Sequence, residues 1–257
     1  SSRVDNYPGI PGIDGYSLGE KFREHAESLG VEFTEAQVLS LGQKDGIWII
    51  GCDEDITLES KAVIYATGCK NRPLGVPGEE KYYGRGLSFC AVCDGAFYKG
   101  KRVAVIGGGD TALDDAMYLS DICEKVYLVH RREFFRGSAS TLEKLKQKEN
   151  VEIIVNARVE EITGDKKIDG IILDNKTKLN ISGLFAAVGM IPQTELLKEF
   201  GVLDESNYVK ASEDTKTTVN GLFAAGDVRT KQLRQVVTAA ADGANAIYSV
   251  MEYLRNI

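Results

Sequence analysis

Histidine, cysteine and long apolar stretches are scarce in this sequence, and each shortage excludes a class of protein. The 257 residues include only two histidines and five cysteines, whereas a structural zinc site usually needs four such ligands in two close pairs. Five cysteines are also too few for a disulfide framework in a chain of this size. No apolar run approaches the roughly 18 residues that span a bilayer, and the N-terminus lacks the apolar core of a signal peptide. We therefore expect no metal site and no membrane attachment.

The overall charge excludes further partners. A formal net charge of −7 and a pI near 5.1 argue against nucleic acid or an anionic membrane as the main partner, because both repel an acidic surface. Hydrophobic residues at 43% and charged residues at 27% are close to the averages of globular proteins. The length suffices for one large or two ordinary domains. These values predict a globular cytoplasmic protein.

Cys90 and Cys93 are separated by two residues in the sequence CAVCDG. In a reducing compartment this spacing indicates redox chemistry, because both sulfurs can meet without backbone movement and a thiolate can attack a partner disulfide. Asp94, directly after the pair, can accept or return the proton. Alternatively, Asp94 and Gly95 only form a turn. The remaining cysteines are expected to be small buried apolar residues, and they are Cys52, Cys69 and Cys123.

A glycine-rich turn follows the cysteine pair. Residues 101–106 (KRVAVI) have the composition of a buried parallel strand, GGGDTA follows at once, and residues 111–119 have the pattern of a helix. Gly107 permits a tight turn, Gly109 lets a pyrophosphate approach the backbone, and Ala112 lets the helix pack closely. A glycine triplet alone can be an ordinary turn, but its position between strand and helix favours a dinucleotide site. The predicted binding residues are Gly107, Gly109, Asp110, Thr111 and Ala112.

The sequence after the next strand indicates which nucleotide is bound. The strand at 125–129 ends in His130, Arg131 and Arg132, with Arg136 four residues further on. A fold specific for NAD would offer a carboxylate to the ribose hydroxyls here, whereas guanidinium groups bind a 2′-phosphate. The alternative is a solvated basic loop. The position at the strand end favours NADPH over NADH.

Apolar strands that end in glycine recur along the chain. The clearest are at 62–65, 184–188 and 221–225, and such endings suit parallel sheets whose ligands lie at the carboxyl ends of the strands. Near the N-terminus, Leu18, Phe22, Ala26 and Leu29 recur at helical spacing, so we expect one face of a helix to be buried and Gly30 to end it. Segments rich in proline and glycine divide the chain into the ranges 1–72, 76–200 and 203–257. The first and last of these are expected to form one discontinuous domain.

These motifs together resemble the low-molecular-weight, bacterial-type thioredoxin reductases. CAVCDG, the glycine turn, the HRR sequence with Arg136, and GLFAAGDV at 221–228 occur in the family's order, from about Asn6 to the C-terminus. The resemblance implies an α/β fold with two Rossmann-like domains, in which 1–72 and 203–257 bind FAD and 76–200 binds NADPH and carries the dithiol. It also implies a homodimeric flavoprotein that transfers electrons from NADPH through FAD and the Cys90–Cys93 disulfide to thioredoxin.

The resemblance assigns individual roles. The second cysteine, Cys93, would lie against the flavin, the first, Cys90, would attack the substrate disulfide, and Asp94 would manage protons. Chain crossings at about 73–77 and 200–203 would act as hinges for domain rotation. The positions that match the family's flavin contacts are Asn6, Thr67, Gly68, Gly226, Asp227, Arg234, Gln235 and Val236.

One departure from the family is large. The family begins with a strand, a glycine-rich turn and a helix that hold the ADP half of FAD, and this sequence has a single glycine-rich dinucleotide turn. We therefore expect the flavin domain to be incomplete at its N-terminus and hypothesise that a leading segment is missing. Two alternative functions remain: a flavoprotein that reduces another dithiol partner, of the alkyl hydroperoxide reductase type, and an NADPH-binding module without turnover.

Overall fold

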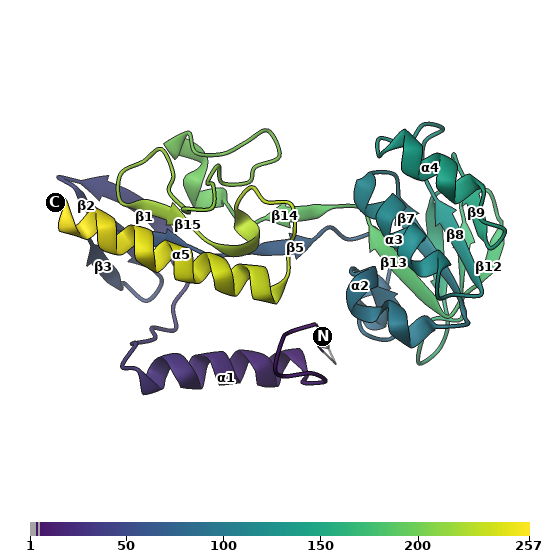
Figure 1. The fold of residues 1–257 in the computed structure, drawn as a ribbon, viewed down its shortest axis with the longest axis horizontal. Coiled ribbons are helices and arrows are strands. Elements are labelled where there is room, and N and C mark those ends of the chain that lie inside the picture. The colour runs from purple at the N-terminus through teal and green to yellow at the C-terminus, as the bar shows by residue number, and fades with distance from the viewer. Residues whose placement is uncertain (1–3, 5) are drawn as a thin grey trace. The chain divides into compact units, whose positions relative to one another are not determined.

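The computed structural model describes residue 4 and residues 6–257, and contacts divide the chain into two compact units (Figure 1). The first unit contains Asn71–Gly189, and the second contains Tyr16–Lys70 and Met190–Ile257. The residues before Tyr16 are divided between the two units in short segments. Residues 190–200, which the proline and glycine pattern had grouped with the middle of the chain, belong to the second unit. The reason is packing, because Leu197 is fully buried in the second unit's core.

A five-stranded parallel sheet forms the centre of the first unit. Its order is β6 (Leu87–Ser88), β13 (Gly183–Ala187), β7 (Arg102–Gly107), β8 (Lys125–Val129) and β9 (Val151–Ile154). Val103 and Val105 of β7 pack against α3 (Asp110–Ser120), and α4 (Ala139–Lys146) contributes to the same core. Ala104 and Ile106 point to the opposite core. All four side chains are nearly or fully buried, as expected for a central parallel strand covered on both faces.

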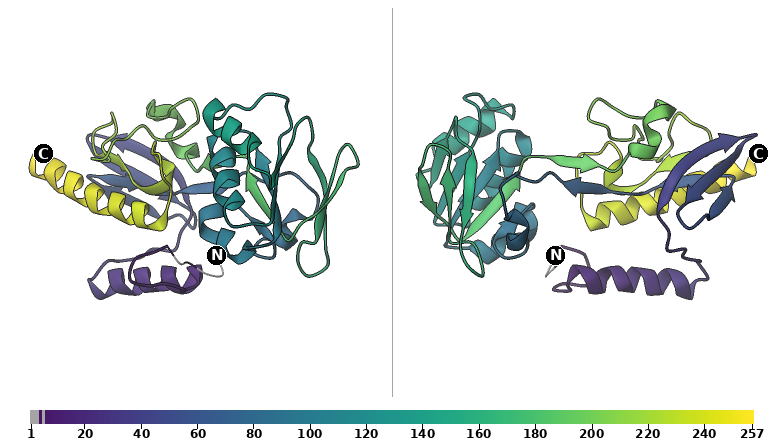
Figure 2. Two further views of the ribbon diagram at one scale, coloured as in Figure 1. Left: turned by 45° about the vertical axis from the view of Figure 1, so that its right-hand side comes forward. Right: turned by 180° about the vertical axis from the view of Figure 1, so that it is seen from behind.

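The opposite face of this sheet is covered by an antiparallel sheet of three short strands. These are β10 (Val159–Thr163), β11 (Gly170–Leu173) and β12 (Lys178–Asn180). Ile162, Ile171 and Leu179 pack with Ala104 and Ile106 in one hydrophobic cluster. Figure 2 shows the resulting layers, with helices on one face of the parallel sheet and β-structure on the other. The apolar-strand pattern at 101–106 thus predicted a doubly covered strand correctly.

Short helices precede β7 in the first unit: η1 (Glu79–Tyr82), α2 (Ala91–Asp94) and η2 (Gly95–Tyr98). The buried carboxylate of Glu79 accepts hydrogen bonds from the backbone N–H groups of Leu74, Gly75 and Val76, at 3.1, 2.9 and 3.0 Å. This clamp attaches most of the segment at 73–77 to the first unit. The chain passes between the units at 70–71 and 189–190 instead. There β5 (Cys69–Asn71) pairs with β14 (Met190–Pro192).

The second unit has a smaller parallel sheet. It consists of β4 (Val63–Tyr65) and β15 (Leu222–Ala224), next to an antiparallel sheet of β1 (Val38–Lys44), β2 (Ile47–Cys52) and β3 (Thr57–Ser60). The helical elements are α1 (Gly15–Ser28), η3 (Glu195–Phe200), η4 (Gly226–Val228) and α5 (Val236–Arg255). Trp48, Leu222 and Val209 are central to its core. None of the helices in the described part of the chain is long and apolar enough to cross a membrane.

The predicted fold class is confirmed, since the structure is a mixed α/β protein with parallel sheets. The predicted helix before Gly30 exists as α1, but the expected burial of its apolar face is wrong for two positions. Phe22 is 40% exposed and Leu29, which lies beyond the helix end, is 73% exposed, whereas Leu18 is buried. Phe22 makes an edge contact with the Tyr7 ring, at 5.5 Å between centroids. Helical spacing specifies a face, but only a packing partner buries it.

Candidate active site

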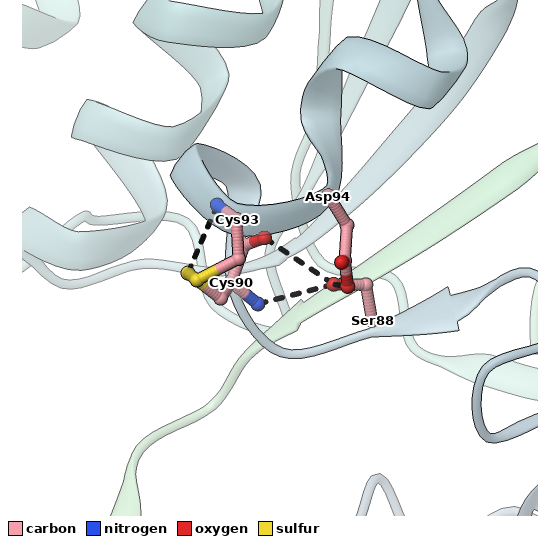
Figure 3. The surroundings of a disulfide bond; sticks show 4 residues. All are labelled: Ser88, Cys90, Cys93 and Asp94. Carbon is pink, nitrogen blue, oxygen red and sulfur yellow. Dashed lines mark hydrogen bonds between the residues drawn. A yellow bond between two sulfur atoms is a disulfide. The ribbon is translucent and has the colours of Figure 1, made fainter. Parts of the chain in front are cut away.

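Cys90 and Cys93 form a disulfide at the start of α2, with their Cα atoms 5.3 Å apart (Figure 3). Cys90 is the N-cap of this four-residue helix and has an extended backbone. The backbone N–H of Cys93 donates to the Cys90 sulfur at 3.2 Å. Both residues are partly exposed. The start of α2 therefore holds the two sulfurs together and aims one backbone donor at the Cys90 sulfur.

Asp94 is held by a serine that no sequence motif pointed to. The hydroxyl of Ser88, at the end of β6, donates to Asp94 Oδ2 at 2.6 Å. The same hydroxyl accepts from the backbone N–H of Cys90 at 3.2 Å (Figure 3). Ser88 is only 5% exposed. One buried hydroxyl therefore connects the backbone of the first cysteine to the adjacent carboxylate.

Gly95 is required for packing rather than for a turn of unusual backbone. Its φ of −57° is right-handed and open to any residue. However, a Cβ at this position would lie 2.8 Å from Tyr118 Cε1 and 3.1 Å from Leu119 Cδ2, both in α3. Asp94, in turn, uses its side chain as an acceptor. The Asp94-Gly95 pair thus combines a hydrogen-bonded carboxylate with a close helix contact.

The glycine turn connects β7 to α3 as predicted. A Cβ on Gly107 would collide with the carbonyl oxygen of Ala187 and lie 2.7 Å from Ala112 Cβ, so this glycine permits strand and helix to approach. Around a Cβ on Gly109, by contrast, no described atom lies within 4 Å. Asp110 and Thr111 occupy the first turn of α3, and Asp110 Oδ1 accepts from the backbone N–H of Ser138 at 2.7 Å. The turn leaves open space beside Gly109 at a helix N-terminus, where phosphate groups bind well.

The basic loop after β8 folds back onto this turn. The backbone N–H of Arg136 donates to the Gly108 carbonyl at 2.7 Å, while the side chains of Arg131, Arg132 and Arg136 are exposed. His130 is different, because it is 6% exposed and its ring fills the space beside Gly108. Burial lowers the pKa of His130, and the three arginines lower it further. The arginine side chains can therefore meet an anion, whereas the buried His130 ring supports the turn from behind.

In the second unit, Asp227 is at the centre of the predicted flavin-binding residues. Its backbone carbonyl accepts from Cys69 Sγ at 2.9 Å and from Arg234 Nε at 3.2 Å. The Arg234 guanidinium also lies over the Tyr208 ring, 4.1 Å from its centroid. Asp227 Oδ1 is buried and has no hydrogen-bond partner within residues 4 and 6–257. Burial raises the pKa of this carboxyl, although Lys231 and Arg234 act in the opposite direction.

Other predicted flavin positions have structural partners of their own. Thr67 Oγ1 donates to the Gln193 carbonyl at 2.6 Å, and the Gln193 N–H donates to the Gly68 carbonyl at 3.0 Å. Gln235 is the N-cap of α5, in a capping box with Thr238, and Val236 begins the helix. Asn6 is exposed and is grouped with the first unit.

A buried ion network behind Gly226 also went unpredicted. Asp242 of α5 accepts from the backbone N–H of Gly226 at 2.8 Å, from Arg229 Nη2 at 2.6 Å and from Lys231 Nζ at 2.8 Å. The Asp242 side chain is 4% exposed. Burial opposes its ionisation, but these hydrogen bonds outweigh burial and lower its pKa. Asp242 thus anchors the turn that carries Asp227.

Both units have features that fit the expected cofactors. The open space at Gly109 and the exposed arginines suit the pyrophosphate and 2′-phosphate of NADPH. The unpaired Asp227 oxygen needs a donor, which a ribityl hydroxyl of a flavin would supply. The described residues contain one strand, glycine turn and helix in direct succession, at β7–α3. The ribityl chain of FAD therefore has a fitting acceptor in Asp227, while its pyrophosphate has no equivalent turn among the described residues.

Comparison with known proteins gives consistent matches over the chain. Residues 8–243 match the family model of the pyridine nucleotide-disulphide oxidoreductases. Thioredoxin reductase of Helicobacter pylori is 39% identical, over 100% of this chain and 86% of the relative. That of Bacillus subtilis is 36% identical, over 99% and 82%. The crystal structure of thioredoxin reductase from Streptococcus pyogenes superposes with a TM-score of 0.91 at 38% identity, covering 100% of this chain and 86% of that one.

Proposed function

Because the chain belongs to the pyridine nucleotide-disulphide oxidoreductases, and within them to the thioredoxin reductases, we propose that Cys90 and Cys93 carry electrons from a flavin to the disulfide of thioredoxin. The enzyme is an NADPH-dependent thioredoxin-disulfide reductase, and its cofactors are FAD and NADPH. The observation that supports the residue assignment is the Cys90–Cys93 disulfide beside Asp94, in the unit that also contains the glycine turn. When bound, the flavin takes a hydride from the nicotinamide and supplies two electrons to this disulfide.

In this proposal the first unit binds NADPH. Backbone N–H groups at the start of α3 hold the pyrophosphate beside Gly109, where the structure leaves space. Arg131, Arg132 and Arg136 bind the 2′-phosphate, and the loop is already folded onto the turn through the Arg136 N–H. Gly107 and Ala112 shape the turn, and His130 supports it through Gly108. Asp110 fixes the loop at Ser138, and Thr111 contributes its N–H.

The second unit binds the flavin. Asp227 Oδ1 accepts a hydrogen bond from a ribityl hydroxyl of the flavin. The resemblance implies that the rest of the flavin is surrounded by Thr67, Gly68, Arg234, Gln235 and Val236. Support comes from the Asp227 environment, since a buried carboxylate oxygen without a partner is costly unless a ligand pairs with it. Asn6 remains a flavin contact by resemblance alone.

Thiol–disulfide exchange then follows from the first unit's own side chains. After reduction, the Cys90 thiolate, favoured by the Cys93 N–H, attacks one sulfur of the thioredoxin disulfide, which breaks the S–S bond and forms a mixed disulfide. Asp94, oriented by Ser88, accepts the proton of Cys93. The Cys93 thiolate attacks the Cys90 sulfur, restores the internal disulfide and releases thioredoxin with two thiols. One proton comes from Asp94 and the other from solvent.

NADPH-driven reduction of thioredoxin by the FAD-loaded protein tests this function. We expect Cys90→Ser and Cys93→Ser each to reduce turnover by at least about a thousandfold, because no relay disulfide can form. Both variants should bind NADPH like the unchanged protein, since neither cysteine belongs to the glycine turn. Full delivery of electrons to thioredoxin by the double variant would refute the proposal.

The same preparation separates the two alternatives. Reduction of a peroxidase-linked dithiol partner at a higher rate than thioredoxin would favour the alkyl hydroperoxide reductase type. A colourless protein that binds NADPH and does not reduce thioredoxin would favour a nucleotide-binding module. Only yellow protein with thioredoxin turnover fits the main proposal.

We also propose that the enzyme is a cytoplasmic homodimer. Four large side chains on α5 support self-association, because Ile247, Tyr248, Met251 and Leu254 are 54%, 76%, 48% and 40% exposed. A dithiol relay that depends on NADPH suits a reducing compartment. Light scattering should give twice the chain mass of 28.1 kDa, and cell fractionation should recover the activity without membranes.

A further inference from the structure

Ser88 contacts the redox pair from the parallel sheet of the first unit. It ends β6, where it pairs in register with Phe185 of β13, a fully buried residue. Just before this strand, the carbonyl of Gly86 accepts from the backbone N–H of Leu184 at 2.8 Å. The Ser88 hydroxyl is therefore held by the core of the sheet, while both cysteines and Asp94 lie in the segment that follows (Figure 3).

The Ser88 hydroxyl has two acceptors within reach and a single hydrogen to donate. Asp94 Oδ2 lies 2.6 Å from Ser88 Oγ, and the Cys90 carbonyl oxygen lies 3.3 Å from it. The shorter distance makes the carboxylate the acceptor in this state. Ser88 Oγ also accepts from the Cys90 backbone N–H at 3.2 Å. The Cys90 carbonyl already accepts from the Asp94 backbone N–H at 3.1 Å, and a carbonyl oxygen has a second lone pair to offer.

The Asp94 side chain is paired with Ser88 rather than with its own helix. Asp94 is the N-cap of η2, but its side chain makes no capping hydrogen bond. It is partly exposed, so a proton can enter and leave. A carboxylate needs a donor beside it, whereas a protonated carboxyl group is itself a donor and needs an acceptor. A group that takes and returns a proton is therefore best supported by a neighbour that can do both.

We propose that Ser88 is a positioning residue for proton transfer, whose hydroxyl donates to Asp94 while that group is ionised and turns to the Cys90 carbonyl once Asp94 has taken a proton. In the second position the Asp94 O–H donates to Ser88 Oγ, and the Ser88 O–H donates to the carbonyl. Every polar group of the set is then paired in both states. This inference deepens the proposed function, because it concerns the same proton acceptor, and Ser88 acts through Asp94 without a net exchange of protons.

The step concerned is closure of the internal disulfide after Cys90 has attacked a substrate disulfide. The proton of the Cys93 thiol passes to Asp94, and the Cys93 sulfur attacks the Cys90 sulfur. The bond between Cys90 and the substrate breaks, so the cysteine pair is oxidised and the substrate sulfur leaves as a thiolate that takes the proton from Asp94. Without the Ser88 hydroxyl, the carboxylate loses its donor and the protonated form loses its acceptor, so closure should be slower.

A small disulfide isolates this step in the whole chain, without flavin, nicotinamide or thioredoxin. The chain is reduced with dithiothreitol, freed of reagent and mixed with hydroxyethyl disulfide, which forms a mixed disulfide with Cys90 and releases mercaptoethanol. Samples are quenched in acid at successive times and the remaining thiols are alkylated. Fragmentation of the peptide that carries both cysteines then locates each product by mass. The lifetime of the Cys90 mixed disulfide measures closure.

We expect Ser88→Ala to lengthen this lifetime about tenfold, the size of one hydrogen bond to a charged acceptor. Asp94→Ala should lengthen it about a hundredfold or more, because the proton acceptor is lost. In that background Ser88→Ala should have no further effect. Ser88→Thr keeps the hydroxyl and should close almost as fast as the unchanged protein. The matched control is Ser120→Ala, because Ser120 is also buried and its hydroxyl donates to the Met117 carbonyl at 2.6 Å, so its loss should not alter the lifetime.

The second position of the hydroxyl has its own spectroscopic signature. Cys90 is the one cysteine followed by alanine, so ¹³C in cysteine carbonyls and ¹⁵N in alanine amides give a single NMR correlation, through the Ala91 N–H. Asp94→Ala removes the preferred acceptor, so the Ser88 hydroxyl should turn to the Cys90 carbonyl and move its ¹³C resonance downfield. Adding Ser88→Ala should return the resonance towards its original position.

The outcomes separate a switching hydroxyl from a merely structural one. A lifetime that Ser88→Ala lengthens equally with and without Asp94 would overturn the inference, because the serine would then act only on the cysteine backbone. Closure as slow in Ser88→Thr as in Ser88→Ala would count against it in the same way, since the hydroxyl would be irrelevant. An unmoved Cys90 resonance in Asp94→Ala would exclude the second position. These readouts use no flavin, NADPH or thioredoxin, so a failure of the proposed electron transfer would leave them unchanged and distinguishable.

Discussion

The two units support a glycine turn after an apolar strand in different ways. In the first unit, close contacts shape the turn after β7, whereas in the second unit buried charges hold the turn after β15. Gly107 and Gly108 fit against Ala187, Ala112 and the His130 ring. Behind Gly226, by contrast, Asp242 joins Arg229 and Lys231. The first turn belongs to a five-stranded parallel sheet and the second to a parallel pair. A strand that ends in glycine therefore does not determine how its site is supported.

The two supports should fail in different ways. The first turn depends on the absence of side-chain atoms at two glycines, so it is complete before any ligand binds. The second depends on charge balance in a site that still contains an unpaired Asp227 oxygen. Packing therefore shapes the first turn, whereas the second combines buried ion pairs with one buried oxygen that has no partner among the described residues.

The largest expected effect is in the second unit. Asp242→Asn removes the buried anion of Lys231 and leaves Arg229 with only the exposed Glu213 as a partner. Breaking a buried pair in this way costs about 3–5 kcal/mol of unfolding free energy. Denaturant unfolding followed by tryptophan fluorescence measures the loss, because the chain's one tryptophan, Trp48, is in the core of this unit. The control is Glu252→Gln, which breaks an exposed pair with Lys216 and should change stability by less than about 1 kcal/mol. Equal losses would remove the contrast between the units.

A smaller loss is expected from Gly107→Ala in the first unit. The added Cβ meets the carbonyl oxygen of Ala187 on the neighbouring strand, which cannot move aside, so we expect a cost of about 1–3 kcal/mol. Hydrogen exchange of β7 and β13 amides measures it. Gly109→Ala is the matched variant, because its Cβ enters open space. It should leave stability unchanged and still weaken NADPH binding about tenfold or more; unchanged affinity would contradict the proposed phosphate position.

The smallest effect concerns pH and Asp115. Burial raises its pKa from 3.8 to about 6, so the folded protein holds this proton more tightly than the unfolded chain. The stabilisation is therefore complete below about pH 4 and is lost as the pH rises through about 6. The full shift corresponds to about 3 kcal/mol, which the partial exposure of Asp115 reduces to about 1 kcal/mol. Asp115→Asn should remove this dependence and make the first unit more stable than the unchanged protein at pH 8. Identical pH profiles of first-unit hydrogen exchange in both proteins would count against a desolvated Asp115.

Much of the first unit could be predicted because its signals are local. The composition of β7, the glycine turn and the pattern of α3 are contiguous, and the spacing of Cys90 and Cys93 already fits a disulfide. The resemblance of these motifs to the thioredoxin reductases predicted the family, and the similar proteins confirm that prediction. The Arg131, Arg132 and Arg136 loop was placed correctly at the end of β8, although the burial of His130 was not foreseen.

The residues that support the two turns and the cysteine pair could not be predicted, and the reason is physical. Ser88 and Asp242 are single polar residues whose partners lie on other elements, and in the sequence they are indistinguishable from surface positions. Phe22 and Leu29 show the opposite error, because their spacing predicted burial that the fold does not provide. Periodicity describes one element, whereas support and burial are properties of pairs of elements.

The Glu79 carboxylate has a consequence for the chain segment that follows the first crossing between the units. By pinning the N–H groups of Leu74, Gly75 and Val76, it denies this stretch the freedom to bend. The remaining connection is the ribbon of β5 and β14. Paired backbone hydrogen bonds therefore support the two segments in which the chain passes from one unit to the other, whereas a single carboxylate supports the segment just after the first crossing.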